Sequence, residues 1–298
     1  MAEEFDELTR LNNEIREMEA GGVPPHDREL LELRCRVAEL LMEEERFEEA
    51  RDVLLDVVAQ GTALGDQADE EFLLRMRSRA AFAVNMSGDT SEAVRYCAEL
   101  IPDMIRTYGE NSVPTLIVRQ NFALCMADDG EEEKAVAEQL DVVNRMYEVS
   151  GMYAPLTLKT RRVLAQLMIR AGESEAASEE YELILPAYRS MFGRAHLQTL
   201  KTRRELIETY KSLFQFDHVI EQLQVMLMDL EQARGSDDFD TLAIRGELAA
   251  FLNSVQRAPE AVEQFELLVA GLEQVLGPDH PDTEIAREQL ADARRSLD

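Results

Sequence analysis

Four histidines are the residues of this 298-residue sequence best suited to general acid–base catalysis or metal binding. His196 and His280 occupy the same loop position in two copies of a 42-residue repeat, which favours a structural role in that loop. His26 lies in the analogous N-terminal loop, and His218 lies where a helix is expected to begin. None has a Ser, Cys or carboxylate nearby at the spacing of a nucleophile or a zinc site.

Three cysteines, Cys35, Cys97 and Cys125, follow unrelated spacings, which excludes a disulfide framework and a cysteine-only zinc site. They fall on predicted helices and are interpreted as small core residues. The acidic clusters at 128–131 and 236–238 lack the alternating pattern of a calcium loop and are typical of helix turns and N-caps. No phosphate loop, dinucleotide fingerprint or HExxH motif occurs. The sequence therefore predicts no catalytic residue, no metal site and no cofactor, and we expect a protein that is not an enzyme.

Composition narrows the class of partner. The chain carries 60 Asp and Glu against 31 Lys and Arg, a formal net charge of −29. Such a field repels phosphates, which argues against direct binding to nucleic acid or to an anionic membrane. No apolar run approaches the roughly 20 residues needed to span a bilayer, and the N-terminus lacks the pattern of a signal peptide. We expect a cytoplasmic protein with a protein or peptide partner, and no pattern indicates its oligomeric state.

A repeat of 42 residues organises the chain. Glycines recur at this spacing from Gly109 to Gly277, and a threonine follows each glycine six residues later. Arginines recur from Arg77 to Arg287, and Arg34 extends the series with one extra residue. A residue that returns in every unit is expected to support the stacking of repeats rather than to contact a ligand. Two further columns, twelve residues apart, hold mostly alanine: Ala38, Ala81, Ala123, Ala165, Ile207, Ala249 and Ala291 in the first, and Ala50, Ala93, Ala135, Ala177, Val219 and Ala261 in the second.

Each period predicts an antiparallel pair of helices. The glycine lies in a loop, the threonine caps or opens the first helix, and a polar turn leads to a second helix. A residue of each alanine column lies on each helix, so the two helices can approach closely. One pair cannot bury its apolar face alone, and the pairs must therefore stack. We expect a helix at 5–19 with Phe5, Leu8, Leu11, Ile15 and Met18 on one face, six pairs at 27–64, 68–108, 110–150, 152–192, 194–234 and 236–276, and a last helix at 281–296.

The small-residue pair twelve positions apart, the 42-residue period and the octapeptide at 276–283 resemble the kinesin-light-chain type of tetratricopeptide repeat. The resemblance covers about residues 27–298. It implies an all-α fold, a right-handed superhelix or α-solenoid of about six and a half repeats with an N-terminal capping helix. The expected organisation is a cap and linker at 1–26, helix pairs at 27–280 and a C-terminal cap at 281–298. Similar arrays are common in bacterial regulators, and the excess of Arg over Lys also suggests a bacterial source.

First helices line the concave side of such an array, and positions counted from the first-column alanine predict which side chains face it. Repeats 2 and 3 then present a largely apolar stretch, and repeats 4 and 5 a basic one. Residues 151–211 hold ten basic and seven acidic side chains, within a strongly acidic chain. The candidate peptide-binding residues are Phe82, Asn85, Met86, Ile117, Gln120, Leu124, Lys159, Arg162, Gln166, Arg170, Lys201, Arg204 and Lys211.

This pattern predicts a groove that takes an acidic or phosphorylated peptide segment, with apolar side chains on repeats 2 and 3 and acidic groups on repeats 4 and 5. The resemblance implies the same kind of ligand, because kinesin-light-chain-like grooves take short acidic peptides with an aromatic anchor. The basic residues could instead balance neighbouring acidic helices. Besides an interaction adaptor, the sequence leaves open a peptide-sensing regulator that changes conformation, and an acidic mimic of nucleic acid that inhibits a nucleic-acid-binding protein.

Overall fold

The polypeptide is helical throughout the part that the computed structural model describes, residues 2–65 and 69–297. Within those residues fourteen α-helices and no strand occur, which confirms the predicted all-α class of stacked helix pairs. In chain order the helices are α1 (Ala2–Ala20), α2 (Arg28–Glu43), α3 (Phe47–Thr62), α4 (Glu70–Met86), α5 (Thr90–Tyr108), α6 (Val113–Asp128), α7 (Glu132–Ser150), α8 (Pro155–Arg170), α9 (Ser174–Phe192), α10 (Leu197–Ser212), α11 (Phe216–Arg234), α12 (Phe239–Ser254), α13 (Ala258–Val275) and α14 (Pro281–Arg295).

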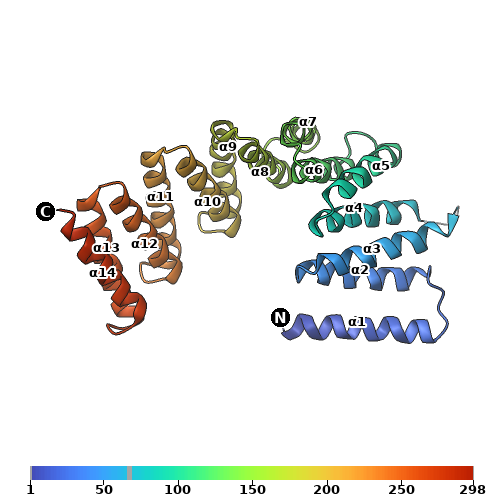
Figure 1. The fold of residues 1–298 in the computed structure, drawn as a ribbon, viewed down its shortest axis with the longest axis horizontal. Helices are drawn as coiled ribbons and strands as arrows, with labels where there is room; N and C mark the ends of the chain where they lie inside the picture. The colour runs from blue at the N-terminus through green and yellow to red at the C-terminus, as the bar shows by residue number, and fades with distance from the viewer. Residues whose placement is uncertain (1, 66–68, 298) are drawn as a thin grey trace. The chain divides into compact units, whose positions relative to one another are not determined.

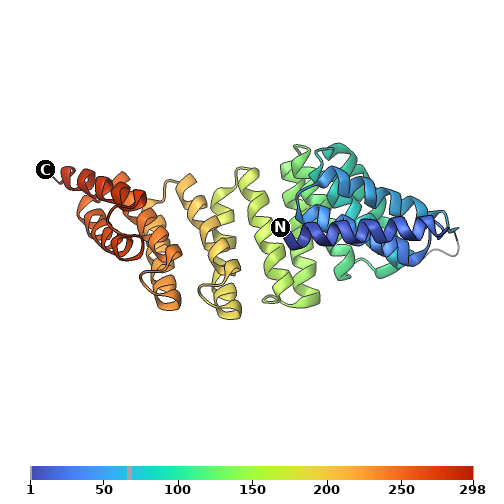
Figure 2. The same cartoon turned by 90° about the horizontal axis from the view of Figure 1, so that it is seen from below.

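Two compact units make up the chain: unit 1, Met1–Ala171, holds α1 to α8, and unit 2, Gly172–Asp298, holds α9 to α14. Within each unit every helix packs on the next helix along the chain (Figures 1 and 2). First helices also contact one another, α4 with α6 and α6 with α8 in unit 1, and α12 with α14 in unit 2. Each predicted helix lies within a few residues of an observed one. The predicted division into two caps and one array stays a prediction.

Small side chains lie where the paired helices meet. Ala38 and Ala50 are fully buried in one hydrophobic cluster, and Ala123 and Ala135 are fully buried in another. Close approach of two helix backbones requires such side chains, because a larger one would separate the axes. Ile207 and Val219 replace alanine in unit 2 and are equally buried. The columns therefore form the core of the six helix pairs, whereas Ala291 on the last helix, α14, is exposed.

Helix ends explain the recurring glycine and threonine. Gly109 ends α5 with φ 91° and ψ 156°, a backbone conformation that is essentially restricted to glycine. The hydroxyl of Thr115 donates to the Gly109 carbonyl at 2.9 Å, and Thr199 repeats this bond to Gly193 at 2.8 Å. Thr115 lies in the first turn of α6 rather than at its N-cap, which is Ser112. The same glycine thus ends one helix and anchors the start of the next.

The arginine column joins first helices to second helices. Arg77 on α4 pairs with Asp103 on α5 at 2.6 Å, and Arg119 on α6 pairs with Glu138 on α7 at 2.6 Å. In unit 2 Arg287 on α14 pairs with Glu273 on α13 at 2.5 Å. The pairs of Arg77 and Arg119 join the two helices of one repeat, whereas the pair of Arg287 joins α14 to the preceding repeat. The predicted role of the whole column in repeat stacking stays a prediction.

The N-terminal helix covers the first repeat. Leu8, Leu11 and Ile15 of α1 are buried in the hydrophobic cluster that also contains Leu30 and Leu31 of α2. Met18 packs against the same cluster. The predicted apolar face therefore forms from Leu8 onward, while the Phe5 side chain lies outside the part that the structure describes.

The glycine conformation can be tested by substitution. We expect Gly109→Ala to lower the free energy of unfolding by about 1–3 kcal/mol, because an L-residue is strained at that φ and ψ. A Cβ there would meet open space, so crowding does not contribute.

The reverse change at Gln256, an exposed residue with φ 63°, removes strain. Gln256→Gly should raise the free energy of unfolding by about 0.5 kcal/mol after the entropic cost of glycine. Urea unfolding followed by circular dichroism measures both, and a neutral Gly109→Ala variant would contradict the argument.

Candidate functional site

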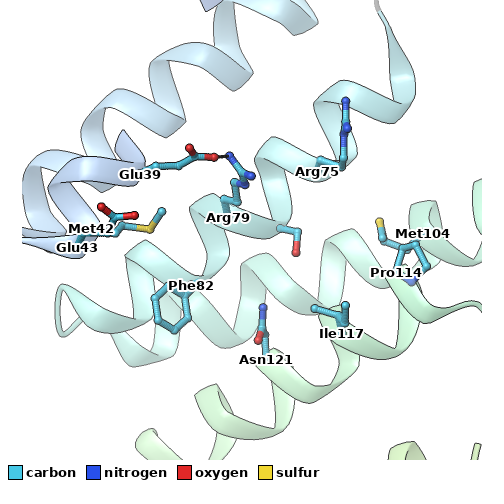
Figure 3. A pocket seen from close by; sticks show the side chains of 11 residues that line it. Glu39, Met42, Glu43, Arg75, Arg79, Phe82, Met104, Pro114, Ile117 and Asn121 are labelled. Carbon is cyan, nitrogen blue, oxygen red and sulfur yellow. Dashed lines mark hydrogen bonds and ion pairs between the residues drawn. The ribbon is translucent and has the colours of Figure 1, made fainter. Parts of the chain in front are cut away.

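A pocket of about 600 Å³ opens on the first-helix side of unit 1. Its walls come from α2, α4 and α6, with Met104 of α5 at one end (Figure 3). Seven of its lining residues occupy the positions that the repeat pattern assigns to the concave face: Glu39, Met42, Glu43, Arg75, Ser78, Phe82 and Ile117. The helix stripes predicted from the alanine register therefore meet in one cavity.

The lining of this pocket is mainly apolar. Phe82 and Ile117 are each 38% exposed, on neighbouring helices, and Met42 and Pro114 lie alongside them. Large apolar side chains at these positions do not pack into the core, because the cores lie on the opposite stripe of each helix. They provide a surface that an apolar side chain of a ligand can cover.

One cation in this pocket is available to a ligand. Arg79 is paired with Glu39, as the dashed line in Figure 3 marks. Arg75, one turn earlier on α4, is exposed and forms no hydrogen bond or ion pair with any residue that the structure describes. Ser78 and Asn121 also line the pocket and can exchange hydrogen bonds with a peptide backbone.

Other predicted residues of repeats 2 and 3 lie outside this pocket. Asn85 is buried and donates to Asp128 at 2.6 Å, and Gln120 accepts from Gln139 at 3.4 Å. Leu124 packs against a hydrophobic cluster between α6 and α8. Met86 is exposed at the end of α4, beside a separate depression at the turn before α3. The structure thus brings Phe82 and Ile117 together and engages Asn85, Gln120 and Leu124 in internal contacts.

Sequence reasoning missed four residues of the pocket: Arg79, Met104, Pro114 and Asn121. Arg79 and Asn121 both lie two positions before the column alanine. That offset belongs to the same helical stripe as the predicted positions, so the periodicity contained the signal. Met104 belongs to a second helix, and no first-helix pattern could have found it.

The basic residues of α8 in unit 1 divide into paired and exposed ones. Arg170 donates to Asp128 at 2.5 Å and to the Ala127 carbonyl. Arg162 and Gln166 are half-buried, and each interacts with other groups of the protein. Lys159 is exposed and has no ion-pair partner within the described part of the chain. Arg170 therefore helps to hold α8 to α6.

Unit 2 repeats this division on α10. Glu247 of α12 accepts from Arg204 at 2.9 Å and from Lys211 at 3.2 Å, and Lys211 also pairs with Glu208 at 2.9 Å. Burial lowers the pKa of Lys211, but the hydrogen bonds to Glu208 and Glu247 outweigh it and leave that pKa raised. Lys201 is exposed, without an ion-pair partner among the residues described. Internal charge balance thus accounts for Arg204 and Lys211.

The histidines of the loops act as helix caps. Nδ1 of His196 accepts from the backbone N–H of Gln198, and Nδ1 of His280 accepts from that of Asp282, both at 3.2 Å. This is the structural role expected of them. Among the described residues, no group of three or more His, Cys, Asp or Glu side chains is arranged to hold a metal ion.

Comparisons with known proteins agree with this architecture. A family model described as Tetratricopeptide repeat matches residues 241–282, one full period. A kinesin light chain protein of Podospora anserina with nearly identical TPR-like repeats is 21% identical, with a TM-score of 0.59 over 67% of this chain and 95% of that one. Residues 241–282 thus match one tetratricopeptide repeat, and the chain as a whole shares the fold of proteins built from such repeats.

Two further solved structures share the fold. BtubC from P. vanneervenii is 15% identical to this chain, with a TM-score of 0.62 over 78% of this chain and 92% of that one. A Rap protein complexed with Competence and Sporulation Factor is 13% identical, with a TM-score of 0.54 over 98% of this chain and 85% of that one. None of the curated protein sequences compared with the chain matches it. These identities support a common fold, so the pocket residues are interpreted from their own geometry.

Within the described residues, no helix combines the length and apolar character that a membrane span needs.

The thiols allow a test of the core. Cys35, Cys97 and Cys125 are all buried, and burial raises the pKa of the Cys35 thiol to about 12. A hydrogen bond with Cys97 and burial also raise the pKa of Cys125. A thiol of that pKa holds about one part in ten thousand of thiolate near pH 8. We therefore expect the native protein to react negligibly with a thiol-specific disulfide reagent, whereas the chain unfolded in guanidinium releases three equivalents. Rapid reaction of the native protein would contradict the assigned packing.

Proposed function

We propose that the protein is a non-enzymatic interaction adaptor, which binds a peptide segment of a partner on the first-helix face of unit 1. The single observation that carries this proposal is the pocket between α2, α4 and α6. Its volume of about 600 Å³ lies within the range of small-ligand pockets, and so admits one large side chain of a peptide.

The anchor of the peptide is an aromatic or large aliphatic side chain. Met42, Phe82 and Ile117 face the same cavity from three successive first helices. Covering these side chains removes apolar surface from water, which is the main driving force for association of this kind. Ser78 and Asn121 then exchange hydrogen bonds with the peptide backbone beside the anchor.

An acidic residue next to the anchor meets Arg75. This guanidinium has no partner among the described residues, so binding a carboxylate breaks no existing ion pair. Charge-assisted hydrogen bonds from arginine to a carboxylate are stronger than neutral ones and are frequently bidentate. The net charge of −29 repels acidic segments elsewhere on the surface, which favours the place where Arg75 adjoins an apolar pocket.

Two exposed lysines, one in each unit, are further candidate binding residues. Lys159 on α8 and Lys201 on α10 have no partners among the described residues and remain candidates for acidic or phosphorylated groups of the ligand. Arg170, Arg204 and Lys211 contribute less to ligand binding, because a ligand would have to displace Asp128 or Glu247. A cytoplasmic location and a partner with an acidic segment remain parts of the proposal.

Charge reversal in the pocket tests this function. A display library of random peptides is selected on the wild-type protein and on Arg75→Glu. The wild type should enrich peptides with one large apolar residue beside Asp or Glu. Arg75→Glu should bind those peptides about tenfold or more weakly, the effect of losing a charge-assisted hydrogen bond, and should select Lys or Arg next to the anchor instead. Phe82→Ala should weaken the peptides of both selections.

The matched control is Arg95→Glu, which makes the same charge change at an exposed position of a second helix. It should select the same peptides as the wild type. Persistence of acidic peptides with unchanged affinity on Arg75→Glu would overturn the proposed role of the pocket.

A further inference from the structure

Three arginines surround one buried carboxylate in unit 2. Asp229 of α11 is fully buried, and its Oδ1 accepts from Arg189 at 2.8 Å, while its Oδ2 accepts from Arg203 at 3.2 Å. Arg194, in the loop after α9, approaches Oδ1 at 3.7 Å. One negative charge is thus shared among three positive ones in the interior of a strongly acidic protein.

These arginines line a second pocket of about 600 Å³ between α9, α10 and α11. Arg203 is only 3% exposed, whereas Arg189 and Arg194 are 39% and 43% exposed. The hydroxyl-bearing Ser190 lies on the same wall, and Leu185, Leu206 and Val225 supply apolar surface. Glu182 is the one acidic residue of the lining, and it accepts from the Tyr210 hydroxyl.

The guanidinium donors outnumber the acceptors around them. Three guanidinium groups offer about fifteen N–H donors. Their described acceptors are the two oxygens of Asp229 and the amide oxygens of Gln222 and Gln232. The buried Nε of Arg203 has no hydrogen-bond partner. Burial lowers the pKa of Arg203, Asp229 opposes this effect and the charge of Arg189 adds to it, so the cations repel one another here.

Some other column arginines meet more carboxylates than the arginines of the fifth repeat do. Elsewhere in the arginine column Arg34 meets two carboxylates, from Glu19 and Asp56, and Arg119 meets Glu138 and Asp141. A second arginine also reaches the column carboxylate in repeats 2 and 3, Arg106 at Asp103 and Arg145 at Asp141. Each of those arginines has a further carboxylate, Glu70 and Glu110 respectively, whereas Asp229 is the one carboxylate that the structure places beside Arg189 and Arg194 among the residues it describes.

We propose that this pocket binds the phosphate group of a ligand, held by Arg189 and Arg194 against the positive end of Arg203. A phosphate monoester carries about −1.5 to −2 charges near neutral pH and three acceptor oxygens, which matches three guanidinium groups that approach from α9, its following loop and α10. A carboxylate would satisfy one arginine fork and leave the others in excess. The cavity is larger than a phosphate ion, and its apolar wall suits the carbon skeleton of a phosphate ester.

The site is separate from the proposed peptide pocket. All of its residues belong to unit 2, whereas Arg75, Phe82 and Ile117 belong to unit 1. Failure of either proposal therefore leaves the other standing, since each has its own variants and its own probe.

Isothermal titration of the full chain with O-phosphoserine and with inorganic phosphate, at matched ionic strength, tests the site. We expect one saturable site per chain. Arg189→Gln with Arg194→Gln should weaken binding at least about tenfold, because two charge-assisted contacts are lost while Arg203 still neutralises Asp229. The single variant Arg194→Gln changes only an exposed side chain, and should weaken binding with an unchanged thermal unfolding curve. Arg257→Gln, a half-buried arginine paired with Glu260, is the control and should bind as the wild type does.

The two probes separate the sources of phosphate. Tighter binding of O-phosphoserine indicates an ester, and equal or tighter binding of inorganic phosphate indicates the free ion, and both support the site. Absence of saturable binding to either probe would overturn the proposal. Unchanged affinity in the double variant, or competition by acetate as effective as that by phosphate, would overturn it as well.

Discussion

An antiparallel helix pair that cannot bury its apolar face alone is the constraint on which this protein depends. Alanines such as Ala38 and Ala50 let the two helices of a pair approach, and stacking within each unit then covers the face that remains. The loop glycines follow from this constraint, because one residue must end a helix and reverse the chain in little space. Arg77 and Arg119 follow from it too, since their ion pairs link neighbouring helices of one unit.

On each first helix, the same constraint leaves a second stripe of side chains that is not part of a hydrophobic core. In unit 1 this stripe carries Phe82 and Ile117, and three such stripes meet as an apolar pocket beside Arg75, which has no ion-pair partner among the described residues. Side chains that would be costly on an ordinary surface are grouped here in one cavity, which is typical of a binding site. In unit 2 the unusual feature is electrostatic instead, because three arginines share the single carboxylate of Asp229.

Arginine has two distinct uses in this chain. At column positions arginine links adjacent helices by ion pairs with their carboxylates, as Arg287 does with Glu273. At Arg75, Arg189 and Arg194 it is exposed and has few or shared acceptors, so its hydrogen-bonding capacity remains for a ligand. Residue type and spacing are alike in both uses, and the number of carboxylates within reach distinguishes them.

The sequence by itself determined the helical fold, the register of the repeat and the face on which Phe82 and Ile117 lie, because these depend on local periodicity and on glycine at loop positions. Only the tertiary structure decided which basic side chains are available. Arg170, Arg204 and Lys211 look alike in sequence to Lys159 and Lys201, yet Asp128 and Glu247, about 40 residues away in the chain, neutralise the first three. Pairing across stacked helices depends on side-chain geometry between repeats, and a periodic pattern along one helix carries no information about it. For the same reason, the sequence did not predict that three arginines would meet at Asp229.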